Sequence, residues 1–164
     1  MKTLEQLRIE HQERKLGHPV HKYFINEYKV KKPKTAANLE ALIEEYVNLS
    51  GGKISIISSA GRQLVKKTAI TDVMGRSNTI TDNTYIPSTT VRGTPDMLGC
   101  MPDGRALAVE VKFSKGDRMS KYQLEYQLKW PGVFIIAKTL EQFIETYTKH
   151  VPNQSGRDAN SRPS

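Results

Sequence analysis

The stretch GTPDMLGCMPDGRALAVEVK, residues 93–112, constrains the fold of this chain more than any other segment. Two mainly apolar runs, residues 97–101 and 106–113, are separated by Pro-Asp-Gly-Arg. These four residues are typical of a turn, and Gly104 suits the positive φ angle that a tight hairpin turn requires. We therefore expect an antiparallel hairpin with its turn centred near Asp103.

The register of this hairpin decides which charged side chains meet. A turn centred near Asp103 places Asp96 opposite Glu110, and opposed residues have Cβ atoms about 4.5 to 5.5 Å apart. Along the second strand, alternation puts Glu110 and Lys112 on one face, beside small alanines that leave room for a cleft. Opposed carboxylates repel each other unless a proton or cation lies between them, and Mg²⁺ or Mn²⁺ prefers oxygen ligands. The pattern predicts a divalent metal site on Asp96 and Glu110, with Lys112 beside it.

These residue types at this spacing point to hydrolysis of a phosphodiester. A divalent ion lowers the pKa of water, and Lys112 can position that water or stabilise negative charge on phosphorus. The competing structural interpretation is a surface salt bridge between Lys112 and a carboxylate, because Glu-x-Lys alone is a short pattern. The Pro-Asp pair upstream, the intervening turn and the basic chain together favour the hydrolytic interpretation.

The composition is basic, since 25 Lys and Arg outnumber 17 Asp and Glu, for a net charge of +8. This balance favours a polyanionic partner such as nucleic acid. From residue 61 to 92 the chain is rich in Thr, Ser and Asn, whose side chains contact phosphate oxygens. A structureless loop of that length is uncommon in a compact domain, so we expect a strand or hairpin within QLVKKTAIT and TYIPSTTV. The predicted nucleic-acid-binding residues are Arg62, Lys66, Lys67, Arg76 and Arg92.

Residues 35–150 are expected to form one domain between an N-terminal extension and a C-terminal tail. Residues 1–34 contain few apolar anchors, and a short peripheral helix is the most that they predict. Residues 151–164 have almost nothing apolar to bury and are expected to be disordered.

The domain should begin with a helix that Thr35 or Asn38 can cap. Its apolar stripe follows a 3.6-residue period. The stripe consists of Leu39, Leu42, Ile43, Tyr46 and Val47. Glu40 falls at the edge of this stripe, where its carboxylate can face the rim of the core. The competing interpretation is a solvated acidic residue that the helix dipole favours.

The C-terminal third predicts a helix, a strand and a closing helix. Ser120-Lys-Tyr-Gln123 is a capping-box pattern, so Gln123 serves the helix start as readily as it serves a site, and the two roles can coexist. Trp130 and the tyrosines of this helix are predicted to be core rather than base-stacking, because of their helical spacing. The run VFIIAK, residues 133–138, predicts an interior strand, and a helix opens at Thr139. These elements predict an α/β (α+β) fold, a mixed β-sheet flanked by helices.

The order of the motifs resembles the PD-(D/E)xK nuclease superfamily. The residues that carry the resemblance are Glu40 on a helix, Gly93-Thr-Pro-Asp96, Gly104-Arg105, Glu110-Val-Lys112 and Ser120-Lys-Tyr-Gln123. More narrowly, the chain is similar over about residues 38–148 to the VRR-NUC family, the virus-type replication-repair nucleases, in the small standalone form found in phages. The resemblance implies a restriction-endonuclease-like fold and a Mg²⁺- or Mn²⁺-dependent DNA endonuclease. Its implied substrates are branched or flapped structures such as Holliday junctions in replication, recombination or repair, cut by a homodimer.

The resemblance also implies roles for individual residues. Glu40, Asp96, Glu110 and the Val111 carbonyl would surround the metal. Lys112 would lie at the attacking water, and Gln123 would support the site. Asp96, Glu110, Lys112 and Gln123 are thus the predicted catalytic residues.

The sequence is also compatible with two other functions. One is a non-catalytic, basic nucleic-acid-binding module in which the acidic cluster is purely structural. The other is a metal-dependent phosphodiesterase that degrades RNA or nucleotides.

Cys100 is the only cysteine, which excludes an intramolecular disulfide and a zinc site built on several thiolates, and it suits a reducing cytosol. No window approaches the ~20 apolar residues of a membrane span, so we expect a cytoplasmic protein, in the host cytoplasm if a phage encodes it.

Overall fold

The computed structural model describes residues 2–57, 62–71, 77–86 and 91–151. In chain order the helices and strands are α1 (Leu4–Leu16), the 3-10 helix η1 (Lys22–Tyr28), α2 (Ala36–Leu49), β1 (Lys53–Ile56), β2 (Arg62–Thr71), β3 (Ser77–Ile86), β4 (Met97–Cys100), β5 (Ala106–Val111), α3 (Lys121–Lys129), β6 (Val133–Ala137) and α4 (Leu140–His150). A mixed four-stranded sheet flanked by helices confirms the predicted α/β class. Across the described ranges, no helix is long and apolar enough to cross a membrane.

The main sheet has the strand order β1-β4-β5-β6. β4 is antiparallel to both of its neighbours, whereas β5 and β6 are parallel. Met97 pairs with Val109 and Cys100 pairs with Ala106. This is the register expected for a turn centred near Asp103, and Gly104 has the expected positive φ of 88°. The predicted hairpin is therefore confirmed.

The strand β6 lies at the edge of the described sheet, so the prediction of an interior strand was wrong. Its continuous apolar run indicated burial on both faces. In the structure only alternate residues, Val133, Ile135 and Ala137, are buried, while Phe134 and Ile136 are partly exposed.

The helices α2 and α4 contact each other, with α2 against β1 and α4 against β6. The predicted stripe of α2 supplies Leu39, Ile43, Tyr46 and Val47 to the core, and Thr35 caps the helix. Tyr46 meets Phe143 edge to face, with ring centroids 6.2 Å apart. Burying these large rings supplies much of the driving force for closing the helices over the sheet.

The helix α1 contributes more to this core than a peripheral helix would. Leu4 and Leu7 are buried in the same apolar cluster as the sheet residues. Thr3 and Gln6 form a capping box at its start. Arg8 makes a two-pronged contact with Glu45 on α2, at 2.7 Å and 2.6 Å. The two apolar anchors and this ion pair hold α1 against α2.

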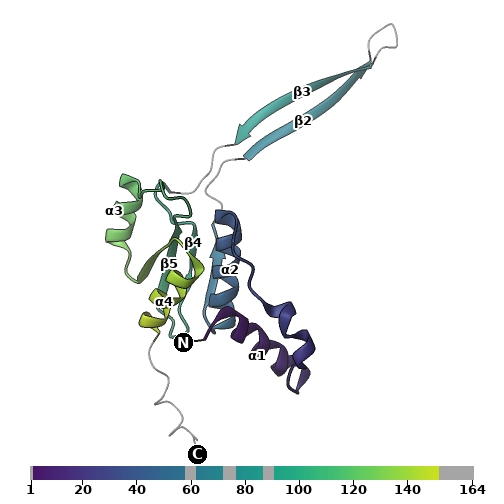
Figure 1. Cartoon of the computed structure of the whole chain (residues 1–164). Coiled ribbons are helices and arrows are strands. Elements are labelled where there is room, and N and C mark those ends of the chain that lie inside the picture. The colour runs from purple at the N-terminus through teal and green to yellow at the C-terminus, as the bar shows by residue number, and fades with distance from the viewer. Residues whose placement is uncertain (1, 58–61, 72–76, 87–90, 152–164) are drawn as a thin grey trace, which may run out of the picture.

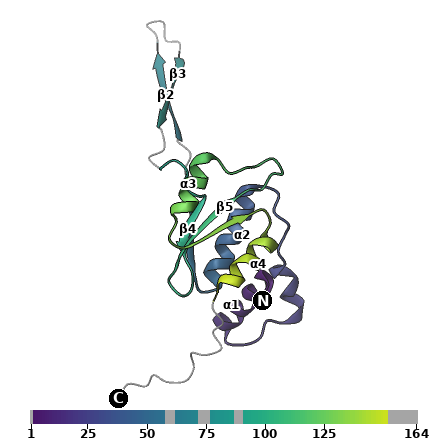
Figure 2. The same cartoon turned by 90° about the vertical axis from the view of Figure 1, so that its left-hand side faces the viewer.

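The strands β2 and β3 form a separate two-stranded sheet, which we call the arm (Arg62–Thr71 and Ser77–Ile86). The arm extends away from the main sheet in both views (Figures 1 and 2). The strand expected within residues 63–71 is confirmed as β2. The second strand lies at residues 77–86 rather than 84–91, because β3 pairs with β2 from Ser77 opposite Thr71.

Replacing Tyr147 with Phe should raise the free energy of unfolding by about 1 kcal/mol, because a buried hydroxyl without a hydrogen bond costs free energy. The Tyr147 hydroxyl is buried and has no hydrogen-bond partner among the described residues. Urea denaturation of both proteins at pH 7 measures the difference.

Burial raises the pKa of Tyr147 well above its ordinary value near 10. The unfolded chain therefore loses this proton at a pH where the folded protein keeps it, so stability falls as pH rises above about 10. The Phe variant should show a smaller fall between pH 9 and pH 11. A destabilisation of more than about 1 kcal/mol at pH 7 would show instead that the hydroxyl is satisfied.

Candidate active site

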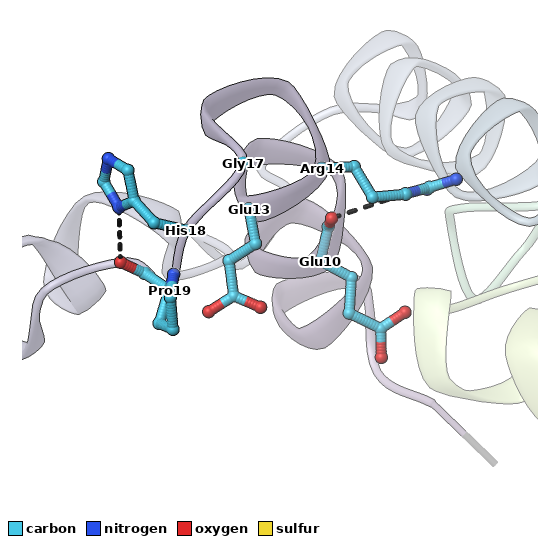
Figure 3. Close-up of a pocket in the computed structure, with 6 residues that line it drawn as sticks. All are labelled: Glu10, Glu13, Arg14, Gly17, His18 and Pro19. Carbon is cyan, nitrogen blue, oxygen red and sulfur yellow. Dashed lines mark hydrogen bonds between the residues drawn. The ribbon is translucent and has the colours of Figure 1, made fainter.

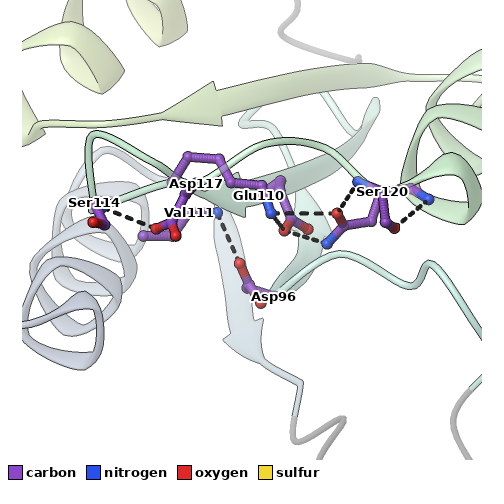
Figure 4. Close-up of polar contacts among 8 residues, drawn as sticks. Asp96, Glu110, Val111, Ser114, Asp117 and Ser120 are labelled. Carbon is purple, nitrogen blue, oxygen red and sulfur yellow. Dashed lines mark hydrogen bonds and ion pairs between the residues drawn. The ribbon is translucent and has the colours of Figure 1, made fainter.

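Asp96 lies directly before β4 and joins three strands at one end of the sheet. Its Oδ2 accepts a hydrogen bond of 2.8 Å from the Val111 amide at the end of β5 (Figure 4). Its own carbonyl accepts a 2.7 Å hydrogen bond from the amide of Ile57, directly after β1. The carboxylate thus takes the place of a backbone acceptor and is held beside the last residues of β5.

Glu110 is the one buried charged residue in the described part of the chain, with 1% of its surface exposed. Its Oε1 lies 2.7 Å from the Lys112 ammonium and also accepts a hydrogen bond from the Gln123 amide. Its Oε2 is buried and has no hydrogen-bond partner among the described residues. Burial raises the pKa of Glu110, the Lys112 contact opposes that rise, and the nearby Asp96 charge adds to it.

Lys112 lies two residues beyond Glu110, on the same face of the strand. The expected alternative was a surface salt bridge, but the pair is enclosed, with side-chain exposures of 12% for Lys112 and 2% for Glu110. The ammonium also donates to Gln123 Oε1 at 3.3 Å. A buried ion pair stabilises a fold poorly, because desolvation offsets the attraction between the charges. The placement of this pair therefore calls for an explanation other than stability.

Gln123 has both of the roles that its sequence pattern allowed. Its backbone amide donates to Ser120 Oγ at 3.3 Å, and its Oε1 accepts from the Ser120 amide at 2.9 Å, which completes the capping box of α3. The same side chain contacts Glu110 and Lys112. The start of α3 is thereby fixed to the end of β5.

Glu40 lies on α2 and is partly buried. Burial raises its pKa, and the negative charge of Asp96 raises it further. Asp96 has the same effect on Glu110, so Asp96 lies within electrostatic reach of both glutamates. Within the residues described, no group of three or more His, Cys, Asp or Glu side chains is close enough to hold one metal ion. The side chains are near neighbours without forming a closed metal cage.

The Val111 carbonyl faces the same side as Asp96. The Lys112 amide donates to the Ala137 carbonyl on β6, whereas the Val111 amide donates to Asp96 on the opposite side. The amide and carbonyl of one strand residue point toward the same neighbour. The Val111 carbonyl is therefore directed toward the Asp96 side.

The donor set fits a hard divalent cation. It consists of carboxylate and carbonyl oxygens, which Mg²⁺ and Mn²⁺ prefer over nitrogen or sulfur. The buried Glu110 Oε2, which has no partner in the described structure, is the atom that most needs a proton or a cation. Asp96 and the Val111 carbonyl could complete the set, and Glu40 could join it only if the three carboxylates moved closer together.

The loop before Asp96 packs tightly on α3. Gly93 has a φ of 86°, and a Cβ built at this position would lie 2.3 Å from the Tyr122 carbonyl oxygen. Only glycine fits there without a shift in the backbone. Arg92, a predicted nucleic-acid-binding residue, is exposed, and its guanidinium carbon lies 5.7 Å from the centroid of the Tyr122 ring.

The other predicted nucleic-acid-binding residues belong to the arm region. Arg62, Lys66 and Lys67 lie on β2. Arg76 lies outside the described residues.

The aromatic residues of α3 lie on an exposed surface next to the candidate site, which the sequence pattern did not predict. The helix has no buried residue, so the prediction that its aromatics are core was wrong. Tyr122 is 48% exposed, and Tyr126 stacks on Trp130 with ring centroids 5.7 Å apart. Helical spacing of aromatic residues does not by itself say whether another layer covers them.

A pocket of about 520 Å³ lies at the C-terminal end of α1 (Figure 3). It is lined by Glu10, Glu13, Arg14, Gly17, His18 and Pro19. None of the predicted site residues contributes to it.

Comparisons with protein-family models, with curated proteins and with solved structures found no match to this chain.

Replacing Asp96 with Asn should lower the pKa of both Glu40 and Glu110, because the Asp96 charge raises both. Carboxyl ¹³C NMR titration of the wild-type protein and of the Asp96→Asn variant measures these pKa values. Both glutamates keep their protons to a higher pH in the folded protein than in the unfolded chain. The free energy of unfolding therefore falls as pH rises from the ordinary carboxyl pKa through the raised values, and the Asn variant should show a smaller fall. Unchanged titration of Glu40 would contradict the cluster, and Glu145→Gln on α4 serves as the remote control.

Proposed function

We propose that this chain is a Mg²⁺- or Mn²⁺-dependent endonuclease that hydrolyses DNA phosphodiester bonds. The observation that carries the proposal is the buried Glu110 carboxylate, whose Oε2 has no partner in the described structure and whose neighbour is the fixed carboxylate of Asp96. Two acidic groups placed this close are unfavourable for folding unless a cation or proton is shared between them. Their placement is typical of a site selected for chemistry rather than for stability.

Each residue of the candidate site would have its own role in hydrolysis. Asp96, Glu110, the Val111 carbonyl and Glu40 would hold the ion, which when bound supplies Lewis-acid activation of water and phosphate. Lys112 places a positive charge beside Glu110, where it can orient a water and stabilise negative charge on the phosphate. Gln123 contacts both Glu110 and Lys112, so it acts as a positioning residue.

DNA as the substrate is supported by charge and by the resemblance. The net charge of +8 favours a polyanion. The motif order from Glu40 to Gln123 supports a VRR-NUC-like enzyme that cuts branched DNA, such as a Holliday junction or flap, as a cytoplasmic homodimer. Replication, recombination or repair is the corresponding process.

A second candidate is a non-catalytic nucleic-acid-binding module on the same fold. One observation favours it, because Lys112 already neutralises part of the Glu110 charge through Oε1. In that case the acidic cluster would serve only to connect β4, β5 and α3. The two candidates differ in whether the carboxylates are needed for cleavage or only for structure.

Purified protein should cleave DNA only when Mg²⁺ or Mn²⁺ is added, and Glu110→Gln or Asp96→Asn should reduce the rate at least about 100-fold. A metal ion contributes several kcal/mol to such a transition state, which corresponds to a loss of this size. The assay uses a four-way junction, a flap, a linear duplex and an RNA of the same sequence, each end-labelled. Junction and flap should be cut faster than duplex and RNA.

Glu145→Gln, an equal change of charge at an exposed position on α4, is the matched control and should cleave at the wild-type rate. Far-ultraviolet circular dichroism confirms that each variant is folded. Metal-dependent cleavage that persists in both Glu110→Gln and Asp96→Asn would exclude this site as the catalytic centre. DNA binding without any cleavage would support the non-catalytic module, and preference for RNA would support the phosphodiesterase alternative.

A further inference from the structure

The described chain stops at Ile57 before the arm and resumes at Val91 after it, and both sides lead to Asp96. The first leg of the arm follows Ile57, whose amide donates to the Asp96 carbonyl, and its second leg returns through residues 91–95 directly to Asp96. Ile57 and Asp96 both lie at the end of the sheet where the Val111 amide of β5 donates to Asp96. The described residues on both sides of the arm, Ile57 and residues 91–95, are therefore close to Asp96 in the fold or in the sequence.

The second leg is also fixed to α3. Gly93 allows the chain to lie against the Tyr122 backbone, and Arg92 lies over the Tyr122 ring. The Thr94 amide and hydroxyl both bond the Val91 carbonyl, at 3.2 Å and 2.7 Å, and this forms a tight turn. Gln123, the next residue of α3, contacts Glu110 and Lys112. The segment that returns from the arm, residues 91–95, and the side chains Glu110 and Lys112 thus both contact the first turn of α3.

The arm has the dimensions of a DNA-groove ligand. Its two strands pair without interruption from Arg62 opposite Ile86 to Thr71 opposite Ser77. Ten residues at about 3.3 Å each give a ribbon about 33 Å long, close to one turn of B-DNA. The major groove is about 12 Å wide and admits a two-stranded ribbon. An isolated two-stranded hairpin is at best marginally stable in water, so a bound partner would add to its stability.

The composition of the arm suits a phosphate-rich partner. Its basic positions on β2 are Arg62, Lys66 and Lys67. Strand β3 instead has mainly hydroxyl and amide positions, which are Ser77, Asn78, Thr79, Thr81, Asn83, Thr84 and Tyr85, and one acidic residue, Asp82, which pairs with Lys66. Thr81 and Asn83 are exposed. Such residue types make most protein contacts with phosphate oxygens, alongside Arg and Lys.

We propose that the arm is a duplex-DNA-binding element that lies in a major groove and directs the duplex to the carboxylates at its base. The inference that the arm binds DNA is argued from its length, pairing and composition. The inference that it directs DNA to cleavage rests on the proposed function. The arm would set which duplex is bound, and Asp96, Glu110 and Lys112 would act on the strand that reaches them.

The test measures DNA binding without cleavage, by fluorescence anisotropy in EDTA with a 30-base-pair duplex and a single strand of the same sequence. One variant replaces residues 58–90 with a short Gly-Ser linker, and a second is R62Q/K66Q/K67Q, which keeps the arm. R14Q/K15Q/K149Q removes the same charge from exposed positions on α1 and α4 and is the matched control. Both arm variants should bind the duplex about tenfold or more weakly, with a log–log salt slope smaller by about 2 to 3 in the triple variant. The single strand should lose less affinity, and the control should stay within about threefold of wild type.

Duplex affinity within about threefold of wild type in both arm variants would overturn the proposal. The proposal would also be overturned if replacing the arm changed the protein from a dimer to a monomer, as measured by light scattering, while the duplex affinity stayed unchanged. In that case the arm would pack against a second copy, through the apolar positions Leu64, Ile70, Ile80 and Ile86. Arm-dependent duplex binding in a protein that never cleaves would refute the proposed function but not the arm. Cleavage that needs Glu110 but not the arm would refute only the arm.

Discussion

The hydrogen bond from the Val111 amide to Asp96 Oδ2 is the interaction on which the candidate site depends. Strand β4 is only four residues long and begins at Met97, which pairs with Val109. On the N-terminal side of Met97, the backbone of β4 no longer supplies a hydrogen-bond partner for the last residues of β5. The Asp96 side chain supplies that partner and is thereby placed beside Glu110. One interaction therefore completes the pairing between the two central strands at this end of the sheet and places Asp96 beside Glu110.

The second constraint is the burial of Glu110. A carboxylate with 1% exposure must be neutralised or supported by hydrogen bonds, and Lys112 and Gln123 do so for Oε1 alone. The other oxygen is left without a partner in the described structure, although an apolar residue at this position would extend the run of buried residues in β5. This unfavourable arrangement is what supports our proposal of a divalent cation, since carboxylate and carbonyl oxygens are ligands that such a cation prefers.

The parts of the fold that sequence reasoning predicted are those set by local chemistry. Pro-Asp-Gly-Arg fixes the centre of its turn, so the pairing of Met97 with Val109 followed from counting residues. The Ser120–Gln123 capping box is likewise a short-range pattern. What sequence reasoning missed depends on whether a further layer covers a surface. The aromatics of α3 have core-like spacing, but no described element covers them, whereas Leu4 and Leu7 of α1 are few in number but lie against the core. The capping pattern of Gln123 gave no direction for its side-chain amide, so its contact with Glu110 could only be expected from the family resemblance.

The central claim is that Asp96 and Glu110 share one divalent cation. Anomalous diffraction from crystals soaked in Mn²⁺ tests it most directly, because the position of the ion is observed without reference to activity. The account predicts one strong peak within coordination distance, about 2 Å, of Glu110 Oε2 and an Asp96 oxygen, with the Val111 carbonyl as a further ligand. An absent peak at saturating Mn²⁺, or a peak elsewhere with Glu110 still bound only to Lys112 and Gln123, would contradict it.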